Sequence, residues 1–186
     1  MNKVPKLLAV IDYQNDFVTG PLGFEGAAAI DDGIARLAQT YLAQGDHVLF
    51  TYDTHDDTYL ETREGRALPI PHCNPGETGW RLYGKTQELC CETCANHQIH
   101  TVCKHAFGMP PAELVKLGQE LPDLKEILVV GVVTNMCVIS NAVLLQAQWP
   151  EAQITVDGAL CRSFDPVLHE KALDVMQGLQ MTVINR

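Results

Sequence analysis

The chain has 186 residues, of which 46% are hydrophobic and 19% are charged, and this is enough for one domain with a full hydrophobic core. Thirteen Lys and Arg against 23 Asp and Glu give a net charge of −10, which argues against binding to a nucleic acid or an acidic membrane. A membrane-spanning helix needs about 20 apolar residues. No apolar run in the sequence approaches this length, so we expect no membrane partner. The first residues also lack the apolar stretch of a secretory signal, which predicts a cytoplasmic protein.

Six short apolar runs alternate with helical patterns along the chain. The runs cover residues 7–11, 47–52, 99–103, 127–131, 153–156 and 181–184. Because they show no polar alternation, they are typical of strands that are covered on both faces, as in a parallel sheet.

Apolar residues recur at helical spacing between these runs. The stripes are Ile30, Ile34, Leu37 and Tyr41; Leu114, Leu117 and Leu121; and Leu168, Ala172, Val175 and Leu179. Gly45 is placed to end the first helix, Pro111 to begin the second, and Asp165 to cap the third. We therefore predict an α/β fold, a three-layer α/β/α sandwich with a six-stranded, mostly parallel, Rossmann-like sheet. Without a repeat, linker or composition break, residues 1–186 are predicted to form a single domain.

Side chains suited to nucleophilic chemistry stand at the carboxyl ends of three predicted strands, where open α/β sheets bind their ligands. Asp12 ends the first run, Lys104 the third, and the fourth leads to Cys137 before an apolar helix over residues 138–147. A thiol in the first helical turn, after the capping residues Thr134 and Asn135, is expected to have a lowered pKa, and Lys104 would lower it further. Asp12 would then serve as the general base. The alternative is a buried inert cysteine, a capping carboxylate and a solvated lysine.

Possible metal ligands stand at the end of the second run. Asp53 and His55 are two residues apart, and His72 follows a proline-rich loop within residues 53–80. Nitrogen and oxygen ligands of this kind suit zinc, manganese or iron. A short Asp-x-His pair also arises by chance, so this pattern alone does not define a site.

Cysteine clustering leaves a second interpretation open. Seven cysteines at irregular spacings form a poor disulfide framework. Cys91 and Cys94 have a spacing that thiolate metal sites use, with Cys90 beside them, but the usual partner pair is absent. We interpret this cluster as a helix end with incidental thiols, and a second metal site is the alternative.

Five motifs follow one another over about residues 7–141. They are Asp12-Tyr13-Gln14-Asn15-Asp16-Phe17, Asp53-Thr54-His55, Pro71-His72-Cys73, Lys104, and Gly131-Val132-Val133-Thr134-Asn135-Met136-Cys137. Their content and order resemble the isochorismatase-like cysteine hydrolases, and the nicotinamidase/pyrazinamidase branch is the closest group with a defined activity.

The resemblance implies a catalytic triad of Asp12, Lys104 and Cys137. Cys137 would attack an amide carbonyl, Asp12 would carry the thiol proton to the departing amine, and Lys104 would hold the thiolate. Backbone N–H groups of Val133 and Cys137 would form the oxyanion hole beside a cis peptide between Val132 and Val133. Water would then hydrolyse the thioester.

The same resemblance implies a divalent metal ion, zinc before manganese or iron, that holds a ring nitrogen of the substrate. Its ligands would be Asp53, His55 and His72, with Glu64 as the fourth and Glu61 as the rival. The implied substrate pocket comprises Phe17, Gln14, Leu68 and Phe107, although Gln14, Asn15 and Asp16 have a second interpretation, in which they only hold the loop. Leu68-Pro69-Ile70-Pro71 lacks the aromatic residue that many nicotinamidases have before the second histidine, and the stretch after Lys104 is shorter than usual.

We therefore expect a cysteine-dependent amidohydrolase that cleaves the C–N bond of a small, nicotinamide-like heteroaromatic amide. An isochorismatase-type hydrolase or an N-carbamoyl hydrolase with the same triad is the alternative. A third, non-enzymatic alternative is a catalytically silent interaction module. The family resemblance further implies a homodimer or higher homo-oligomer.

Overall fold

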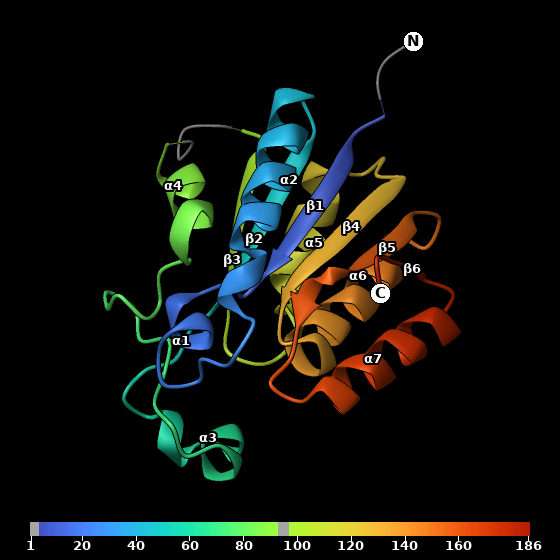
Figure 1. The fold of residues 1–186 in the computed structure, drawn as a ribbon. Helices are drawn as coiled ribbons and strands as arrows, with labels where there is room; N and C mark the ends of the chain where they lie inside the picture. Colours follow the sequence, from blue (N-terminus) through green and yellow to red (C-terminus); the bar gives the residue numbers. More distant parts are fainter. Residues whose placement is uncertain (1–3, 93–96) are drawn as a thin grey trace.

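A six-stranded sheet runs through the protein in the computed structural model, which describes residues 4–92 and 97–186 (Figure 1). Its strands are β1 (Lys6–Ile11), β2 (His47–Asp53), β3 (Ile99–Lys104), β4 (Glu126–Val132), β5 (Gln153–Arg162) and β6 (Thr182–Ile184). The strand order is β3-β2-β1-β4-β5-β6, and each neighbouring pair is parallel. The predicted α/β class is confirmed, and the sheet is parallel in all its pairings rather than mostly so.

Helices cover both faces of the sheet and make three layers (Figure 1). Helices α2 (Asp31–Ala43) and α4 (Gly84–Glu92) pack on one face, and α5 (Pro111–Glu120), α6 (Ile139–Gln148) and α7 (Pro166–Gly178) pack on the other. Strand β1 serves both layers, because successive side chains of a strand point to opposite faces. Leu8 and Val10 pack with α2, whereas Leu7 and Ala9 pack in the cluster that includes α5, α6 and α7.

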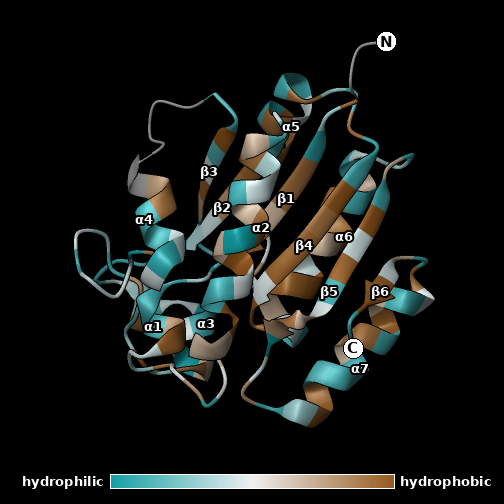
Figure 2. Cartoon of the chain, turned by 45° about the horizontal axis from the view of Figure 1, so that its top comes forward, coloured by the Kyte–Doolittle hydropathy of each residue, from teal (hydrophilic) through white to brown (hydrophobic). Residues whose placement is uncertain are grey.

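Burial follows the position of each strand in the sheet. In β1 and β2 every residue except the first is buried, whereas the edge strands β3 and β6 keep exposed positions. Hydrophobic colour accordingly dominates β1 and β4 in Figure 2. Among the described helices, none has both the length and the apolar character to cross a membrane.

Strand β5 is the one that departs most from its predicted run. The run covers residues 153–156, but the strand continues to Arg162. Asp157 and Gly158 interrupt the apolar pattern, and pairing with β4 resumes beyond a register shift, where Gly131 lies opposite Cys161. Backbone pairing can therefore extend a strand past residues that the hydropathy pattern excludes.

Helix α7 begins as predicted but buries a different face. The Asp165 carboxylate accepts hydrogen bonds from the N–H groups of Val167 and Leu168, at 2.8 and 3.0 Å. The predicted stripe is wrong at Leu168, Val175 and Leu179, which are exposed by 38%, 51% and 42%, whereas its fourth residue, Ala172, is buried. The buried residues of the helix are Ala172, Leu173 and Met176. Two apolar stripes share this helix, and spacing alone does not distinguish the one that meets the sheet.

Short helical segments interrupt the loop after β1 and the long connection after β2. The short helix α1 (Asn15–Val18) follows β1, and a 3-10 turn at Ala28–Ile30 leads into α2. Another 3-10 turn (Tyr59–Glu61) and helix α3 (Arg63–Ala67) lie in the predicted loop of residues 53–80. This loop is therefore structured where it approaches the sheet edge.

Candidate active site

The carboxyl ends of β1 and β4 form the point where the strand order reverses, which is where α/β sheets open a crevice. Gly131 permits the two strands to lie close together there. Its φ is +118°, and a Cβ at this position would lie 2.2 Å from the backbone oxygen of Ile11. Asp12 follows β1 at this edge, and Asp53 and Lys104 are register partners at the ends of β2 and β3.

Lys104 joins the groups that the sequence predicted to converge. Its Nζ lies 2.7 Å from Asp12 Oδ2, 2.9 Å from Asp53 Oδ1 and 3.5 Å from Cys137 Sγ. A further hydrogen bond reaches the backbone oxygen of Ala106 at 3.0 Å. Lys104 and Asp12 are fully buried, so water does not screen these charges. One ammonium therefore contacts two carboxylates and a thiol.

Two hydrogen bonds with Thr51 on β2 fix the position of Asp12. Its backbone N–H donates to Thr51 Oγ1 at 3.0 Å, and the Thr51 hydroxyl donates to Asp12 Oδ1 at 2.6 Å. Burial raises the pKa of Asp12, while Lys104 opposes that change. Thr51 was not predicted from the sequence, although a lone threonine inside an apolar run was the available signal. A carboxylate with a raised pKa is a better proton acceptor than an ordinary aspartate.

The thiol of Cys137 differs from the sequence prediction. Burial raises the pKa of Cys137 well above its ordinary value, and the attraction of Lys104 only opposes this. The prediction of a lowered thiol pKa is therefore wrong, because it counted the helix and the lysine but not the loss of water around the sulfur. For Lys104, burial acts to lower the pKa, but Asp12, Cys137 and Asp53 outweigh it and raise the pKa. Burial therefore favours the neutral form of the Cys137 thiol, whereas the acidic neighbours of Lys104 favour its charged form.

Cys137 lies in a π-helical turn, Thr134–Val138, rather than in the first turn of α6. The peptide between Val132 and Val133 is cis, as the family resemblance implied. Thr134 and Asn135 do not cap the helix, which corrects the sequence prediction. The Thr134 hydroxyl is hydrogen-bonded to His169 Nδ1 at 2.8 Å, and Asn135 Oδ1 accepts from the Ser163 hydroxyl at 2.6 Å. These bonds tie the turn to α7 and to the end of β5.

Asn141 fixes the turn from the other side, and it was not predicted from the sequence. Its side-chain amide donates to the backbone oxygens of Cys137 and Phe107, at 2.8 and 2.9 Å. Its Oδ1 accepts from the N–H of Met109 at 2.8 Å. A buried asparagine in an apolar helix was the signal that could have revealed this role.

Four potential metal ligands gather beside this cluster. One ligand atom from each of Asp53, His55, Glu64 and His72 lies within 4.8 Å of every other. Asp53 Oδ2 is 3.1 Å from His55 Nε2 and 3.4 Å from His72 Nε2. Burial acts to raise the pKa of Asp53, but the hydrogen bonds with His55 and His72 and the charge of Lys104 hold it well below its ordinary value. The group contains Glu64 and not the rival Glu61, which is exposed.

Local structure brings these ligands together and suits a metal ion. The Thr62 side chain accepts from the N–H of Gly65 at 2.9 Å and starts helix α3, which carries Glu64. His72 donates its Nδ1–H to the backbone oxygen of Ile70 at 2.7 Å, so its Nε2 is left for a ligand role. Two imidazoles and two carboxylates form a donor set that fits zinc, manganese or iron.

A cavity of about 490 Å³ borders the metal-ligand group through His55 and Glu64. Its other lining residues are Thr54, Asp56, Thr58, Tyr59, Thr62, Arg63, His105 and Ala106. Tyr59 was not predicted from the sequence, and its ring centroid lies 4.4 Å from that of His55 and 5.0 Å from that of His72. The cavity therefore leads from the surface to the ligand group.

The four predicted pocket residues take different places. Phe17 is nearly buried and packs against the ring of His72, with centroids 5.6 Å apart. Gln14 is fully buried and bonds the backbones of Asp53 and Trp80, so we correct its assignment as a pocket residue. Phe17 does not line the cavity, and neither do Leu68 and Phe107.

The contacts of Leu68 and Phe107 show why they lie outside it. The backbone oxygen of Leu68 accepts from the Tyr59 hydroxyl at 3.0 Å, and Phe107 packs against the apolar cluster that includes α5 and α6. Both residues therefore serve the structure around the site.

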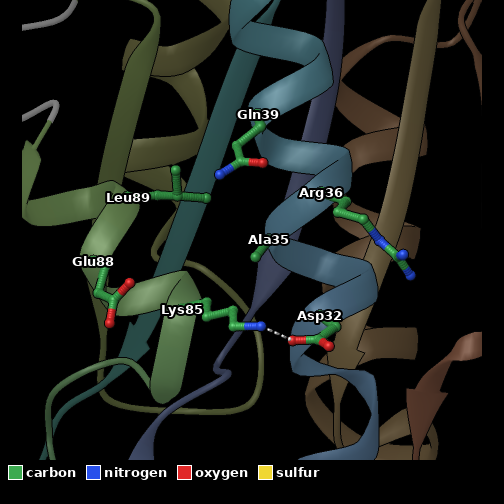
Figure 3. A pocket seen from close by; sticks show the side chains of 7 residues that line it. All are labelled: Asp32, Ala35, Arg36, Gln39, Lys85, Glu88 and Leu89. Carbon is green, nitrogen blue, oxygen red and sulfur yellow. Dashed lines mark hydrogen bonds and ion pairs between the residues drawn. The ribbon is translucent and has the colours of Figure 1, made fainter.

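A second hollow, of about 450 Å³, lies between α2 and α4 and has a different character (Figure 3). Lys85 Nζ and Asp32 Oδ1 form an ion pair of 2.7 Å across it, and their side chains are 63% and 64% exposed. Arg36, Gln39 and Glu88 also line it. Over the part of the chain that is described, no group of metal ligands gathers in this hollow.

The cysteine cluster at the end of α4 is described only in part. Cys90 is buried, and its sulfur lies 3.4 Å from the Tyr52 hydroxyl. The side chain of Cys91 and the whole of Cys94 lie outside the described residues. The choice between incidental thiols and a second metal site therefore stays a prediction.

The whole described site lies within a match to a protein-family model. The isochorismatase domain model matches residues 6–186, and the chain belongs to the isochorismatase family. The isochorismatase family protein PncA of Bacillus subtilis (strain 168) is 30% identical over 141 residues, which are 74% of this chain and 76% of that protein.

Solved structures agree with this assignment. The nicotinamidase PncA from Bacillus subtilis has a TM-score of 0.85 and 30% identity, over 96% of this chain and 98% of that one. The pyrazinamidase/nicotinamidase from Streptococcus mutans UA159 has a TM-score of 0.86 and 27% identity, over 96% of this chain and 99% of that one. The fold and nearly the full length of both proteins are thus shared.

Proposed function

We propose that the protein is a cysteine-dependent amidohydrolase that cleaves the C–N bond of a small, nicotinamide-like amide. The observation that carries this proposal is the contact of one buried ammonium, Lys104, with Asp12, Asp53 and Cys137. The likeness to a nicotinamidase and a pyrazinamidase/nicotinamidase over almost the entire chain supports the substrate class. Residues 1–186 would act as one domain.

In the first step, Cys137 Sγ attacks the carbonyl carbon of the amide while Asp12 accepts the thiol proton. The raised pKa of Asp12 makes its carboxylate a competent base for a thiol that burial keeps protonated. Lys104 contacts both Asp12 and Cys137, so it stabilises the negative charge as this charge passes from the carboxylate of Asp12 to the sulfur of Cys137. Proton transfer inside the site therefore replaces the preformed thiolate that the sequence suggested.

The second step releases ammonia. Negative charge on the former carbonyl oxygen would be met by the backbone N–H groups of Val133 and Cys137. The protonated Asp12 gives its proton to the amide nitrogen, the C–N bond breaks, and a thioester to Cys137 remains. A water molecule, deprotonated by Asp12, then attacks the thioester. The products are a carboxylic acid and the restored thiol.

A divalent metal ion belongs to the same proposal. Asp53, His55, Glu64 and His72 would hold it, with zinc favoured by the donor set and manganese or iron also suitable. When bound, the ion supplies a Lewis-acid contact that orients a ring nitrogen of the substrate. The protein residues alone carry the proton transfers.

Measurement of ammonia release from a panel of substrates tests the proposed function. The panel comprises nicotinamide, pyrazinamide, benzamide, N-carbamoyl compounds and isochorismate, with the products of isochorismate followed separately. We expect nicotinamide and pyrazinamide to be hydrolysed faster than benzamide, which lacks the ring nitrogen. Turnover of only the N-carbamoyl compounds or of isochorismate would replace the proposal with the corresponding alternative. A catalytically silent module would hydrolyse none of them.

Two further predictions from the sequence belong here. The family resemblance favours a homodimer or a higher homo-oligomer, and sedimentation of the purified protein would establish its mass in solution. A cytoplasmic location is the prediction that the cysteine usage favours. Both stay predictions.

A further inference from the structure

The segment after β1 contacts the metal-ligand group without contributing a ligand to it. Gln14 is fully buried, and both the nitrogen and the oxygen of its side-chain amide form hydrogen bonds with the backbone of Asp53. Its Nε2 donates to the Asp53 oxygen at 2.9 Å, and its Oε1 accepts from the Asp53 N–H at 2.8 Å. A second hydrogen bond from Nε2 reaches the backbone oxygen of Trp80 at 2.8 Å. The side chain of Gln14 therefore fixes the residue that offers a carboxylate to the site.

Asp16 acts on the two histidines through a single residue, Cys73. The Asp16 Oδ2 accepts from the N–H of Cys73 at 2.7 Å, and the Cys73 oxygen accepts from the N–H of His55 at 3.1 Å. His72 directly precedes Cys73, whose φ of +52° is unusual for a residue with a side chain. The buried carboxylate of Asp16 thus fixes Cys73, a residue with a strained backbone. Cys73 follows His72 in the chain and is hydrogen-bonded to the backbone of His55.

Close packing leaves the Asp16 carboxylate little freedom. A Cβ on Gly79 would lie 2.2 Å from Asp16 Oδ1, and one on Gly20 would lie 2.4 Å from the same atom. The backbone N–H of Asp16 also donates to the oxygen of Gly79 at 3.0 Å. Two glycines therefore let the neighbouring backbone close around the carboxylate, which holds its direction toward Cys73.

We propose that Asp16 and Gln14 are positioning residues that set the affinity of the metal site. Asp16 holds the His72 and His55 segments through Cys73, and Gln14 holds Asp53. This inference rests on the metal site of the proposed function and goes beyond it, because neither residue offers a ligand atom. Outer partners of metal ligands typically contribute a factor of about 10 to 100 in affinity.

Asp31 provides a matched control for Asp16. Both carboxylates are 8% exposed, and both accept backbone N–H groups from a distant segment. Asp31 accepts from the N–H groups of Lys85 and Thr86, at 2.9 and 3.2 Å, at the start of α4. One of these partners, Lys85, lines the hollow between α2 and α4, and none of the four metal-ligand residues lines it (Figure 3). Loss of Asp31 should therefore cost stability without changing metal binding.

Zinc affinity of the whole protein, measured by competition with a chromogenic chelator, tests the inference. We expect Asp16→Ala and Gln14→Met to bind zinc about 10- to 100-fold more weakly than the unchanged protein. Asp16→Asn should recover most of the affinity, because its amide oxygen can still accept the Cys73 N–H. Asp31→Ala should keep the original affinity while its thermal midpoint falls.

Absorption of the cobalt-substituted protein gives a second readout, because the visible bands of Co²⁺ depend on ligand geometry. We expect altered bands in Asp16→Ala and Gln14→Met and unaltered bands in Asp31→Ala. If Asp16→Ala does not fold, the comparison of Gln14→Met with Asp31→Ala decides the question.

Two results would overturn the inference in distinguishable ways. If the unchanged protein binds zinc and the Asp16 and Gln14 variants match it, the positioning role fails and the metal site stands. If the unchanged protein binds no zinc, manganese or iron, the metal site itself fails, and the inference fails with it.

Discussion

Two pairs of histidines lie at opposite ends of the same sheet. His55 and His72 are at the carboxyl edge, with ring centroids 4.7 Å apart. His47 and His100 are at the amino ends of β2 and β3, with centroids 5.2 Å apart and Nδ1 of His47 3.1 Å from Nε2 of His100. The two pairs are made of the same residue type at similar spacing.

The acidic neighbours of the two pairs differ. Burial acts to lower the pKa of His72, but the hydrogen bonds to Asp53 and to the backbone of Ile70, together with the charges of Asp53 and Glu64, outweigh it and raise the pKa. At the amino end, burial lowers the pKa values of His47 and His100, although Glu120 lies 3.1 Å from His100. Asp53 and Glu64 converge with His55 and His72 and make that pair a candidate metal site, whereas His100 at the amino end contacts one carboxylate, Glu120, and among the described residues no group of three or more ligands gathers there.

The largest expected effect is on enzymatic activity, and it distinguishes the carboxyl edge of the sheet from the amino end. Cys137→Ala should reduce amide hydrolysis by more than about a thousandfold, because it removes the nucleophile. His100→Gln, at the other end of the sheet, should retain most of the activity. Initial rates of ammonia release with matched amounts of folded protein check both variants. Comparable losses in the two would contradict the assignment of chemistry to the carboxyl edge.

Lys104→Met should cause the next largest effect, on stability. The change leaves the carboxylates of Asp12 and Asp53 buried without their cation, which typically costs about 3–5 kcal/mol in the free energy of unfolding. Chemical denaturation gives this quantity. Lys85→Met removes an equally short but exposed ion pair with Asp32 and should leave the denaturation midpoint unchanged. A Lys104→Met protein as stable as the original would mean that the buried charges are compensated elsewhere.

Zinc binding sharpens the comparison of the histidine pairs directly. His72→Ala removes a ligand and should weaken zinc binding by at least about a hundredfold. His47→Ala should bind zinc as the unchanged protein does, since among the described residues His47 belongs to no group of three or more potential ligands. Isothermal calorimetry with zinc alone distinguishes the two. Equal affinities in both variants would place the metal elsewhere.

The smallest expected effect is the pH dependence of the amino-end pair. The pKa values of His47 and His100 are lowered in the folded protein, so the unfolded chain takes up protons first as the pH falls below 6.5. The pair should therefore destabilise the protein between pH 7 and pH 5, by a few degrees in the unfolding midpoint. Asp46 and Glu120 oppose the shift, and Lys116 adds to it.

The double variant His47→Gln/His100→Gln should show a flatter dependence of the midpoint on pH over this range. An unchanged slope would assign the acid sensitivity to other groups.

Much of the sheet and its functional edge could be predicted, because strands covered on both faces leave continuous apolar runs that end where polar groups begin. Asp12, Lys104 and Cys137 were found from their positions at or beyond the ends of these runs. Features that depend on three-dimensional surroundings could not be predicted: the raised pKa of Cys137 comes from lost water, and the buried face of α7 comes from the orientation of the helix on the sheet. The choice between Gln14 as a pocket residue and Gln14 as a residue that holds the loop could not be made from the sequence, because its partner Asp53 is distant in the chain.

The hydrogen-bonding roles of Thr51 and Asn141 were also missed, because the groups that they bond lie far away in the sequence or depend on packing. Thr51 and Asn141 are polar residues inside apolar segments, and such residues are the signal that a buried hydrogen bond exists. The sequence marks these positions but does not name the group that each one bonds.

Trapping of the thioester tests the central claim most directly. Hydroxylamine added during hydrolysis of nicotinamide competes with water for an acyl-enzyme at Cys137, and the products are separated by chromatography. We expect the hydroxamic acid to form in proportion to the hydroxylamine concentration, and Cys137→Ala to form none. Release of ammonia with only the free acid as product, at every hydroxylamine concentration, would contradict attack by the thiol.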